Sequence, residues 1–452
     1  MLNTKRHGKL AAVAVMAATA LAITSCSTND STKPAAVGDS TAPAAAAEPV
    51  TITVHTFGGG ENFGYKKAVE TWNAAHPDIQ VKHQNLTDRF EDVYLPQLLQ
   101  KLQAGSGTGD IVGIDEGAMG LMKARPQFFT DLAQYGLDSR KSDFPAAKWD
   151  NGVNKDGKLF ALGTDIGGMA MCYRKDLLQK AGLPSERDEV SKLWPDWDSF
   201  MAAGKKFQAA NTGKGDPKFL DGPNTLYNVV LSQEAPKNGN IAYFDTDNQL
   251  VIDKNPAIKT SFDTVKSYSE AGLTAKLASF TPEWNAAIKK GGFAVMGCPA
   301  WMVGVISGAA GDEGKGKWDV AGVPGGAGNW GGSYLAIPAQ SKHPKEAAEV
   351  LNFLTGQEGH VMAFQEANAF PSSLSGQQDP AVADLKNEFF SDAPTGKIFG
   401  DSVKDLQPVF LGEKHAQVKT AAEKILEGMD KGSVPYGEAW AKFIEAGTKA
   451  AG

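Results

Sequence analysis

The feature that most constrains the fold is an alternation of strand-like and helix-like segments that begins near residue 50. Residues 51–56 (TITVHT) are β-branched at alternate positions, as half-buried strands are. A stretch with helical periodicity follows. Further strand-like runs at residues 79–83 and 110–114 enclose a second helical stretch at 94–103. This β-α-β-α-β order predicts an α/β fold in which helices cover a parallel sheet.

The alternation continues along the chain, and the last hundred residues are mainly helical in pattern. The part after residue 50, about 400 residues, is long enough for two domains of ordinary size. We find no internal repeat of fixed period. Further strands are expected at residues 169–173, 293–296, 318–323 and 334–337, and further helices at 176–181, 197–209, 256–271, 281–290 and 345–354.

The N-terminal segment has a different composition. Basic residues precede an uncharged apolar run, residues 10–23, that is too short to span a bilayer, so residues 1–25 are predicted to be a signal peptide. The small residues before Cys26 resemble a bacterial lipobox, in which the cysteine becomes the lipidated first residue of the mature protein. The alternative is an ordinary cleaved signal with an incidental cysteine. Residues 26–49, rich in Ser, Thr, Ala and Pro, predict a disordered tether.

The charge of the chain limits its partners. The formal net charge is −7 and is more negative without the basic leader, which argues against nucleic acid or anionic lipid as a partner. We expect contact with the membrane through the lipid anchor only, on its extracellular face, because no second long apolar run exists. The histidines form no close pair, so neither a metal site nor a cofactor is expected.

Two cysteines remain besides Cys26. Cys172 and Cys298 lie in strand-like segments, and outside the cytoplasm such a pair is commonly oxidised. We therefore expect a disulfide between them. Two buried free thiols are the alternative.

Five segments in chain order resemble the sugar-binding lipoproteins of bacterial ABC importers, the family 1 extracellular solute-binding proteins. They are residues 98–112 (LLQKLQAGSGTGDIV), 156–165 (DGKLFALGTD), 173–183 (YRKDLLQKAGL), 332–338 (GSYLAIP) and 344–359. The resemblance covers the whole chain after the tether. It implies a two-lobed periplasmic-binding-protein-like fold of type II. It also implies a monomeric binding protein that delivers a sugar to permease subunits and is not an enzyme.

The resemblance also implies where the lobes begin and end. By analogy, hinge crossovers between the lobes fall near residues 163–165, 330–332 and 370–372, which are rich in Gly, Pro or small residues. The expected N-lobe is 50–163 with 331–370, and the expected C-lobe is 164–330 with 371–452.

A narrower resemblance concerns the ligand. Residues 171–174 (MCYR), 192–197 (KLWPDW) and 298–302 (CPAWM) look like the cellobiose and cello-oligosaccharide binders of actinobacteria. Related members take xylo-oligosaccharides or other sugars, so xylobiose remains an alternative to cellobiose and its longer β-1,4-linked oligomers.

A saccharide presents apolar C–H faces and a rim of hydroxyls, so its pocket needs aromatic plates and short polar groups. The aromatic candidates are Trp301, Trp330, Trp284 and Phe57. Trp301 follows a strand and Trp330 lies at a crossover, where the carboxyl ends of strands open. Packing in the core is the alternative for each of them. For Trp284, whose neighbours follow a helical pattern, a packed helix face fits equally well.

The polar candidates are carboxylates and the groups beside a crossover. The resemblance places a ligand-contacting acid at Asp165, and Asp115 and Glu116 follow the third strand. An ionised carboxylate accepts several hydrogen bonds from hydroxyls. The backbone of Gly331 and Gly332 allows close approach of a sugar, and Asn329 is a candidate donor. Each acid has the alternative of lying in a surface loop.

A secreted glycosidase is the rival function. Such an enzyme pairs two carboxyl groups across the scissile bond, and Asp115, Glu116 and Asp165 offer enough acids for that. No hydrolase motif accompanies them, so we favour the binding protein, although the residues alone leave the enzyme open.

Overall fold

The computed structural model describes residues 48–58, 63–404 and 406–452. The chain divides into two units, Met1–Ala47 and Glu48–Gly452, and every feature below belongs to the second. The predicted signal peptide, the lipidation site Cys26 and most of the tether lie outside the described residues, so they remain predictions.

The first lobe is built on a five-stranded sheet of order β2-β1-β3-β9-β4. As predicted, β1 (Val50–Thr56), β2 (Ile79–Asn85) and β3 (Ile111–Asp115) are parallel. The parallel sheet expected from the β-α-β-α-β order extends over these strands only, because β9 (Ser333–Ala336) runs antiparallel to both β3 and β4 (Ala161–Gly163) and makes the sheet mixed. β9 enters the sheet from the other lobe, so no local crossover helix fixes its direction.

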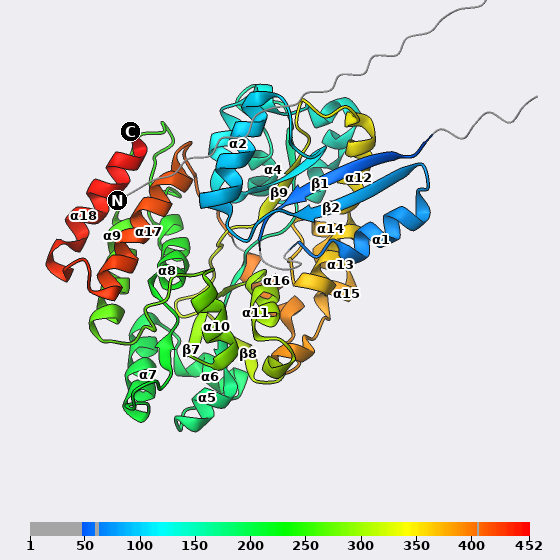
Figure 1. Ribbon diagram of the computed structural model, residues 1–452. Helices are drawn as coiled ribbons and strands as arrows, with labels where there is room; N and C mark the ends of the chain where they lie inside the picture. The colour runs from blue at the N-terminus through cyan, green and yellow to red at the C-terminus, as the bar shows by residue number, and fades with distance from the viewer. Residues whose placement is uncertain (1–47, 59–62, 405) are drawn as a thin grey trace, which may run out of the picture. The chain divides into compact units, whose positions relative to one another are not determined.

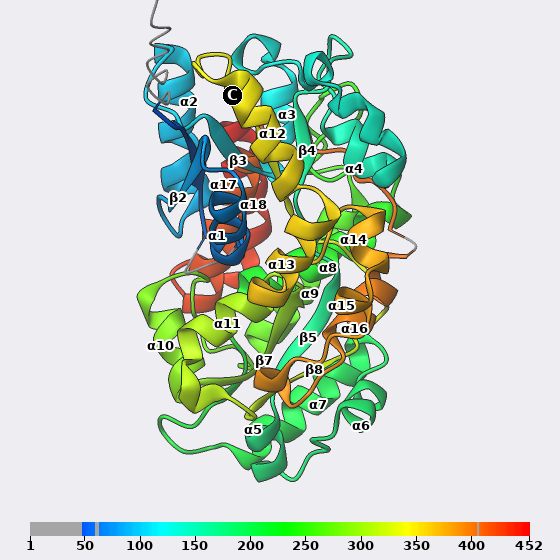
Figure 2. The same cartoon turned by 90° about the vertical axis from the view of Figure 1, so that its right-hand side faces the viewer.

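The second lobe is built on a four-stranded sheet of order β6-β7-β5-β8. Its strands are β5 (Met169–Arg174), β6 (Lys218–Leu220), β7 (Phe293–Pro299) and β8 (Trp318–Ala321). β5, β7 and β8 are buried along their whole length, which explains their continuous apolar sequences. Figure 2 shows the second sheet in the lower part of the view, beneath the strands and helices of the first.

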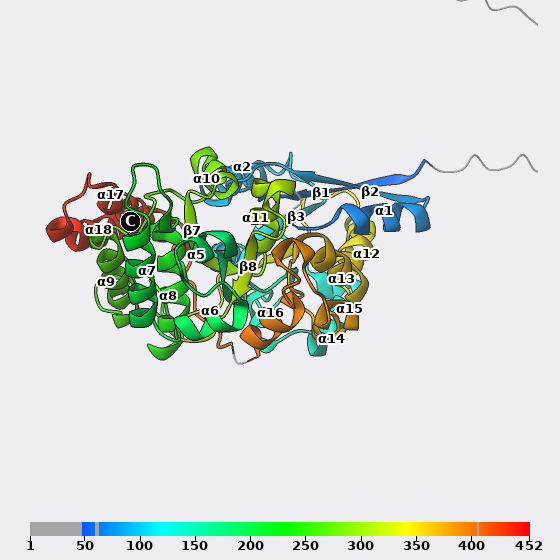
Figure 3. The same cartoon turned by 90° about the horizontal axis from the view of Figure 1, so that it is seen from below.

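Helices cover the faces of both sheets (Figure 1). They are α1 (Lys66–Ala75), α2 (Leu95–Ala104), α3 (Met119–Lys123), α4 (Ala146–Asn151), α5 (Lys175–Lys180), α6 (Arg187–Leu193), α7 (Trp197–Ala210), α8 (Pro223–Lys237), α9 (Pro256–Glu270), α10 (Pro282–Lys290), α11 (Met302–Ala310), α12 (Pro344–Leu354), α13 (Gln357–Ala367), α14 (Leu374–Gln378), α15 (Pro380–Ala383), α16 (Thr395–Val403), α17 (His415–Lys431) and α18 (Tyr436–Ala451). α17 packs against α18 and α9, as Figure 3 shows.

The predicted helix ends follow from local capping. The Asn255 side chain accepts a hydrogen bond from Ala257 N at the start of α9, with proline at the first helical position. Thr281 caps α10 in the same way, and Gly291 ends α10 in the left-handed conformation. These signals placed both helices within a residue of their observed bounds.

The segments that join the two sheets are hydrogen-bonded to one another. Thr164 N donates to Ser333 O (2.9 Å), Ile166 N to Phe370 O (2.9 Å), and Trp330 N to Gly167 O (2.9 Å). A Cβ atom on Gly167 would lie 1.9 Å from Trp330 O, so only glycine allows this approach. The three predicted crossovers therefore lie side by side, as a hinge between two lobes requires. The residue limits of the lobes remain a prediction.

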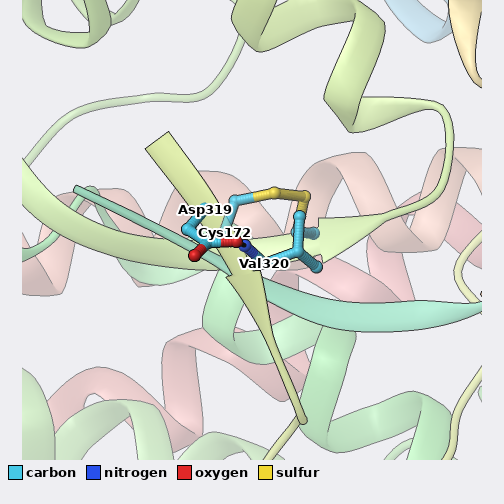
Figure 4. The surroundings of a disulfide bond; sticks show 4 residues. Cys172, Asp319 and Val320 are labelled. Atoms are coloured by element: carbon cyan, nitrogen blue, oxygen red, sulfur yellow. Dashed lines mark hydrogen bonds between the residues drawn. A yellow bond between two sulfur atoms is a disulfide. The ribbon is translucent and has the colours of Figure 1, made fainter. Parts of the chain in front are cut away.

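Cys172 and Cys298 form a disulfide, as predicted, with their Cα atoms 5.3 Å apart. The two cysteines lie on the neighbouring antiparallel strands β5 and β7, where Cys172 pairs with Met296 and Cys298 pairs with Ala170. Figure 4 shows Cys172 beside Asp319 and Val320 of the adjoining strand β8. The bridge lies within one sheet and leaves the hinge segments unlinked.

Replacing both cysteines, Cys172→Ala with Cys298→Ala, is expected to lower the free energy of unfolding by about 2–4 kcal/mol. The reason is that the bridge joins residues 126 apart and so restricts the unfolded chain. Guanidinium unfolding with and without reductant checks this. Reductant should shift the unfolding midpoint of the wild type and leave that of the variant in place. Equal midpoints for the wild type and the variant without reductant would contradict the prediction.

Candidate functional site

A cavity of about 840 Å³ lies between the two lobes. The first sheet, the crossovers and the helices α8, α11 and α17 contribute to its walls. Most of the residues selected from the sequence line it: Trp301, Trp330, Phe57, Asp165, Asp115, Glu116, Asn329, Gly331 and Gly332. The structure thus brings together residues from Phe57 to Gly332, which lie 275 positions apart in the chain.

Two tryptophans form the aromatic part of the cavity wall. Trp301 directly precedes α11 and Trp330 lies in a crossover, and their rings meet edge to face with centroids 5.5 Å apart. Trp301 Nε1 donates to Trp330 O (3.0 Å). This bond uses the only polar atom of the Trp301 side chain, so the indole offers apolar surface to the cavity. Phe280 extends the wall, with its centroid 6.2 Å from that of Trp301.

The structure removes Trp284 from the candidate plates. This tryptophan is fully buried on α10, and its Nε1 donates to the buried carboxylate of Asp221 (2.9 Å). The packed helix face, which the pattern allowed equally, is what the structure shows. Phe57 lines the cavity but is 5% exposed and packs against Phe63 and Phe90, so most of its ring belongs to the core of the first lobe.

Asp165 joins two crossovers as well as lining the cavity. Its Oδ1 accepts hydrogen bonds from Ser333 N (2.8 Å) and from Thr164 Oγ1 (2.7 Å). The residue is 6% exposed. One of its oxygens is therefore used to hold the hinge.

Glu116 is held by a lysine that sequence reasoning missed. Lys148, on α4, donates to Glu116 Oε2 (3.0 Å) and lies 4.2 Å above the ring of Tyr334. Asn329 Nδ2 approaches Glu116 Oε1 (3.4 Å), which ties the first lobe to a crossover. Lys148 follows no motif, and only its position against the crossovers marks it.

Gly332 has a conformation and an environment that exclude other residues. Its φ is +104°, and a Cβ would lie 2.5 Å from Asp165 O and 2.9 Å from Lys148 Nζ. Its carbonyl accepts a hydrogen bond from Glu116 N (3.0 Å). Gly331 and Gly332 thus let the crossover pass close to the charged groups of the cavity.

Asp115 begins the short turn that carries Glu116, and its Oδ1 accepts from Gly117 N (2.8 Å). Burial, first of all, and the nearby Glu91 raise the pKa of Asp115 to about 7, against the opposing effect of Lys419. Near neutral pH this carboxyl is therefore present in both protonated and ionised forms.

Replacing Asp115 with asparagine should change the pH dependence of stability. The folded protein keeps a proton on this carboxyl, with a pKa of about 7, that the unfolded chain loses near pH 4. The free energy of unfolding of the wild type therefore falls, through this group, as pH rises from 4 to 7. We expect Asp115→Asn to gain stability relative to the wild type between pH 5 and pH 8. Urea unfolding at both pH values checks this, and a constant difference contradicts it.

Several buried polar atoms in the cavity lining have no partner within the described protein. They are Tyr65 Oη, Asn224 Oδ1, Ser279 Oγ, Asn329 Oδ1, His360 Nε2 and His415 Nδ1. Burial lowers the pKa of both histidines to about 3, so their rings are neutral. A buried polar atom without a partner costs about 1–3 kcal/mol. Hydroxyl groups, which both donate and accept, would satisfy this mixed set.

Comparison with known proteins identifies the family. A model of the bacterial extracellular solute-binding protein family matches residues 67–390. The chain belongs to this family. The solute-binding protein is similar to a solved extracellular solute-binding protein of family 1, with 34% identity and a TM-score of 0.75, over 89% of this chain and 100% of the other. Membership decides against the glycosidase alternative: this is a binding protein and not an enzyme.

For two further similar proteins a saccharide ligand is named. The arabinooligosaccharide-binding protein of Bacillus subtilis (strain 168) is 25% identical over 320 residues, which are 68% of this chain and 69% of that protein. The ABC transporter associated binding protein from B. animalis subsp. lactis Bl-04, solved with β-1,6-galactobiose, is 20% identical with a TM-score of 0.74. That match covers 89% of this chain and 98% of the other, and it shows the shared fold.

Two properties of the solute-binding protein concern metals and membranes. Among the described residues, no group of three or more His, Cys, Asp or Glu side chains is placed to hold a metal ion. None of the helices in the described ranges combines the length and apolar character needed to cross a membrane.

Proposed function

We propose that this solute-binding protein captures an oligosaccharide outside the cell and delivers it to the permease subunits of an ABC importer. The observation that carries the proposal is the cavity between the lobes, in which Trp301 and Trp330 accompany a set of buried polar atoms without partners. Aromatic surface suits the C–H faces of a sugar, and the polar atoms suit its hydroxyls. The saccharides named for two relatives support the same class of ligand.

We propose cellobiose and longer cello-oligosaccharides as the preferred ligands. This choice rests on the resemblance of residues 171–174, 192–197 and 298–302 to cellobiose binders. The saccharides named for the relatives are arabinooligosaccharide and β-1,6-galactobiose. The linkage is therefore the part of the proposal that the experiment must test first.

The proposed roles follow the positions of the side chains. Trp301 and Trp330 act as plates; Asp165, Asp115 and Glu116 accept hydrogen bonds from hydroxyls. Asn329 donates, and Gly331 with Gly332 allows close approach. The lobes turn about the three crossovers, and the ligand favours the closed state because it contacts both lobes at once.

We further propose that the protein acts as a monomer tethered to the extracellular face of the membrane. Residues 26–49 are the tether and acyl chains on Cys26 are the anchor, which suits a family of extracellular proteins.

Calorimetric titration with cellobiose, xylobiose, arabinobiose and β-1,6-galactobiose tests the proposal. We expect micromolar or tighter binding of cellobiose, on the order of −8 kcal/mol. Tighter binding of another disaccharide would keep the oligosaccharide class and overturn the proposed linkage. Binding of none of the four, with cellotetraose also silent, would overturn the proposed function.

A further inference from the structure

Two helices of the second lobe present a matched row of polar side chains to the cavity. α8 and α17 lie side by side (Figure 1). Asn224 and Asn228 are one turn apart on α8, and Glu423 and Glu427 are one turn apart on α17, so each pair lies on one helix face. Asn224 Nδ2 donates to Glu427 Oε1 (2.8 Å) and Asn228 Nδ2 to Glu423 Oε1 (2.7 Å). We call these four residues, all of which line the cavity, the Asn–Glu strip.

The Asn–Glu strip is fixed in place by its surroundings. Lys419, one turn before Glu423, lies 3.4 Å from that carboxylate and 3.0 Å from Glu91 of the first lobe. On its other face, α17 buries Val418, Ala422, Leu426 and Met429 in the core. The strip therefore has its geometry before any ligand binds, which lowers the entropic cost of binding.

The strip retains unused capacity for hydrogen bonds. Asn224 is 7% exposed, and its Oδ1 is buried without a partner within the described protein. Each carboxylate has two oxygens and accepts several hydrogen bonds. Each receives one from an asparagine. Lys419 lies 3.4 Å from Glu423 Oε1 and Lys431 lies 3.7 Å from Glu427 Oε2, and both carboxylates can accept further bonds. If these hydrogen bonds served only to join α8 to α17, the four side chains would not need to line the cavity. Neighbouring hydroxyls of a sugar ring are donors that match this row of acceptors.

The strip and the aromatic wall belong to different elements. Trp301 and Trp330 come from the end of β7 and from a crossover, whereas the strip comes from α8 and α17. Within the described ranges, no hydrogen bond or ring contact joins the strip to either tryptophan. Both sets line the same cavity, so a ligand that contacts both must extend along it.

From this arrangement we propose that the Asn–Glu strip is a second saccharide subsite, which binds the hydroxyls of sugar units beyond those held by the tryptophans. The inference rests on the proposed function and sharpens it: the ligand is a linear oligosaccharide longer than two units. The affinity of the protein then rises with chain length.

The test compares two chain lengths in the wild type and in variants of the strip. Purified protein is titrated with cellobiose and cellotetraose, and with xylobiose and xylotetraose as the second series. We expect Glu427→Ala and Asn224→Ala each to weaken tetrasaccharide binding about tenfold, the equivalent of about one hydrogen bond, and to change disaccharide binding less than twofold. Glu438→Ala, on the exposed face of α18, is the matched control and should change neither.

The outcomes separate this inference from the proposed function. Wild-type binding that is equal for both lengths overturns the second subsite, and so do variants that weaken both lengths equally or neither. In those cases the oligosaccharide-binding function stands. Silence of the wild type toward every sugar overturns the proposed function itself, and the subsite with it.

Discussion

Replacing Trp301 with alanine is expected to weaken saccharide binding by about thirtyfold or more, because a buried aromatic anchor contributes about 2 kcal/mol or more. The Trp301 indole is fixed by its hydrogen bond to Trp330 O and by ring contacts with Trp330 and Phe280. The binding surface is therefore formed before the sugar arrives. Calorimetry with cellobiose measures the loss, and Trp301→Phe should retain part of the affinity.

The matched control for this prediction is Trp440→Ala. Trp440 lies on α18, where it packs against Phe262 and Phe443 and does not line the cavity. Its removal costs packing in the second lobe but no contact with the ligand. If both alanine variants lost the same affinity, the effect would report general destabilisation, and Trp301 would not be a binding residue.

The aromatic wall could be predicted from the sequence because apolar runs and glycines mark where strands end and where the chain crosses between lobes. Residues 293–296 read as a buried strand, so Trp301 was placed where the chain leaves a sheet, and β7 (Phe293–Pro299) confirms this. The glycines around Trp330 marked a crossover that the hydrogen bond of Trp330 N to Gly167 O confirms. The prediction that Trp284 contacts the ligand was wrong, because a tryptophan on a helix has the same sequence spacing whether its side chain faces a ligand or the core.

The sequence placed Asp165, Asp115, Glu116 and Asn329 in the cavity wall, but it could not predict the Asn–Glu strip or Lys148. α8 is buried on nearly every side, including Asn224 and Asn228, so it has no apolar stripe to mark it as a helix. Its partner residues Glu423 and Glu427 lie about 200 positions further along the chain. Lys148 likewise meets Glu116 only through tertiary packing. Contacts of this kind carry no periodic signal and no fixed spacing.

Replacing Lys148 with methionine is expected to lower the free energy of unfolding by about 3 kcal/mol, because it leaves Glu116 in the cavity wall without its cation. The Lys148 and Glu116 side chains are 5% and 16% exposed, so solvent compensates little of the loss. Lys148 also lies against two crossovers, since Cβ atoms on Gly163 and Gly332 would each come within 2.9 Å of its side chain. Denaturant unfolding measures the effect, and Lys141→Met, at an exposed position, should cost less than about 0.5 kcal/mol.

A double-mutant cycle separates the ion pair from the packing of the lysine stem. With Lys148→Met already present, Glu116→Gln removes the unpaired charge and should restore at least half of the lost stability, whereas Glu116→Gln alone should destabilise. Additive effects would mean that Lys148 acts through its contacts with the crossovers and not through Glu116. The expected coupling would instead show that a buried charge pair in the first lobe holds the acid that faces the ligand. The same pair would fix the crossover at Gly332, so that hinge and site are stabilised by one interaction.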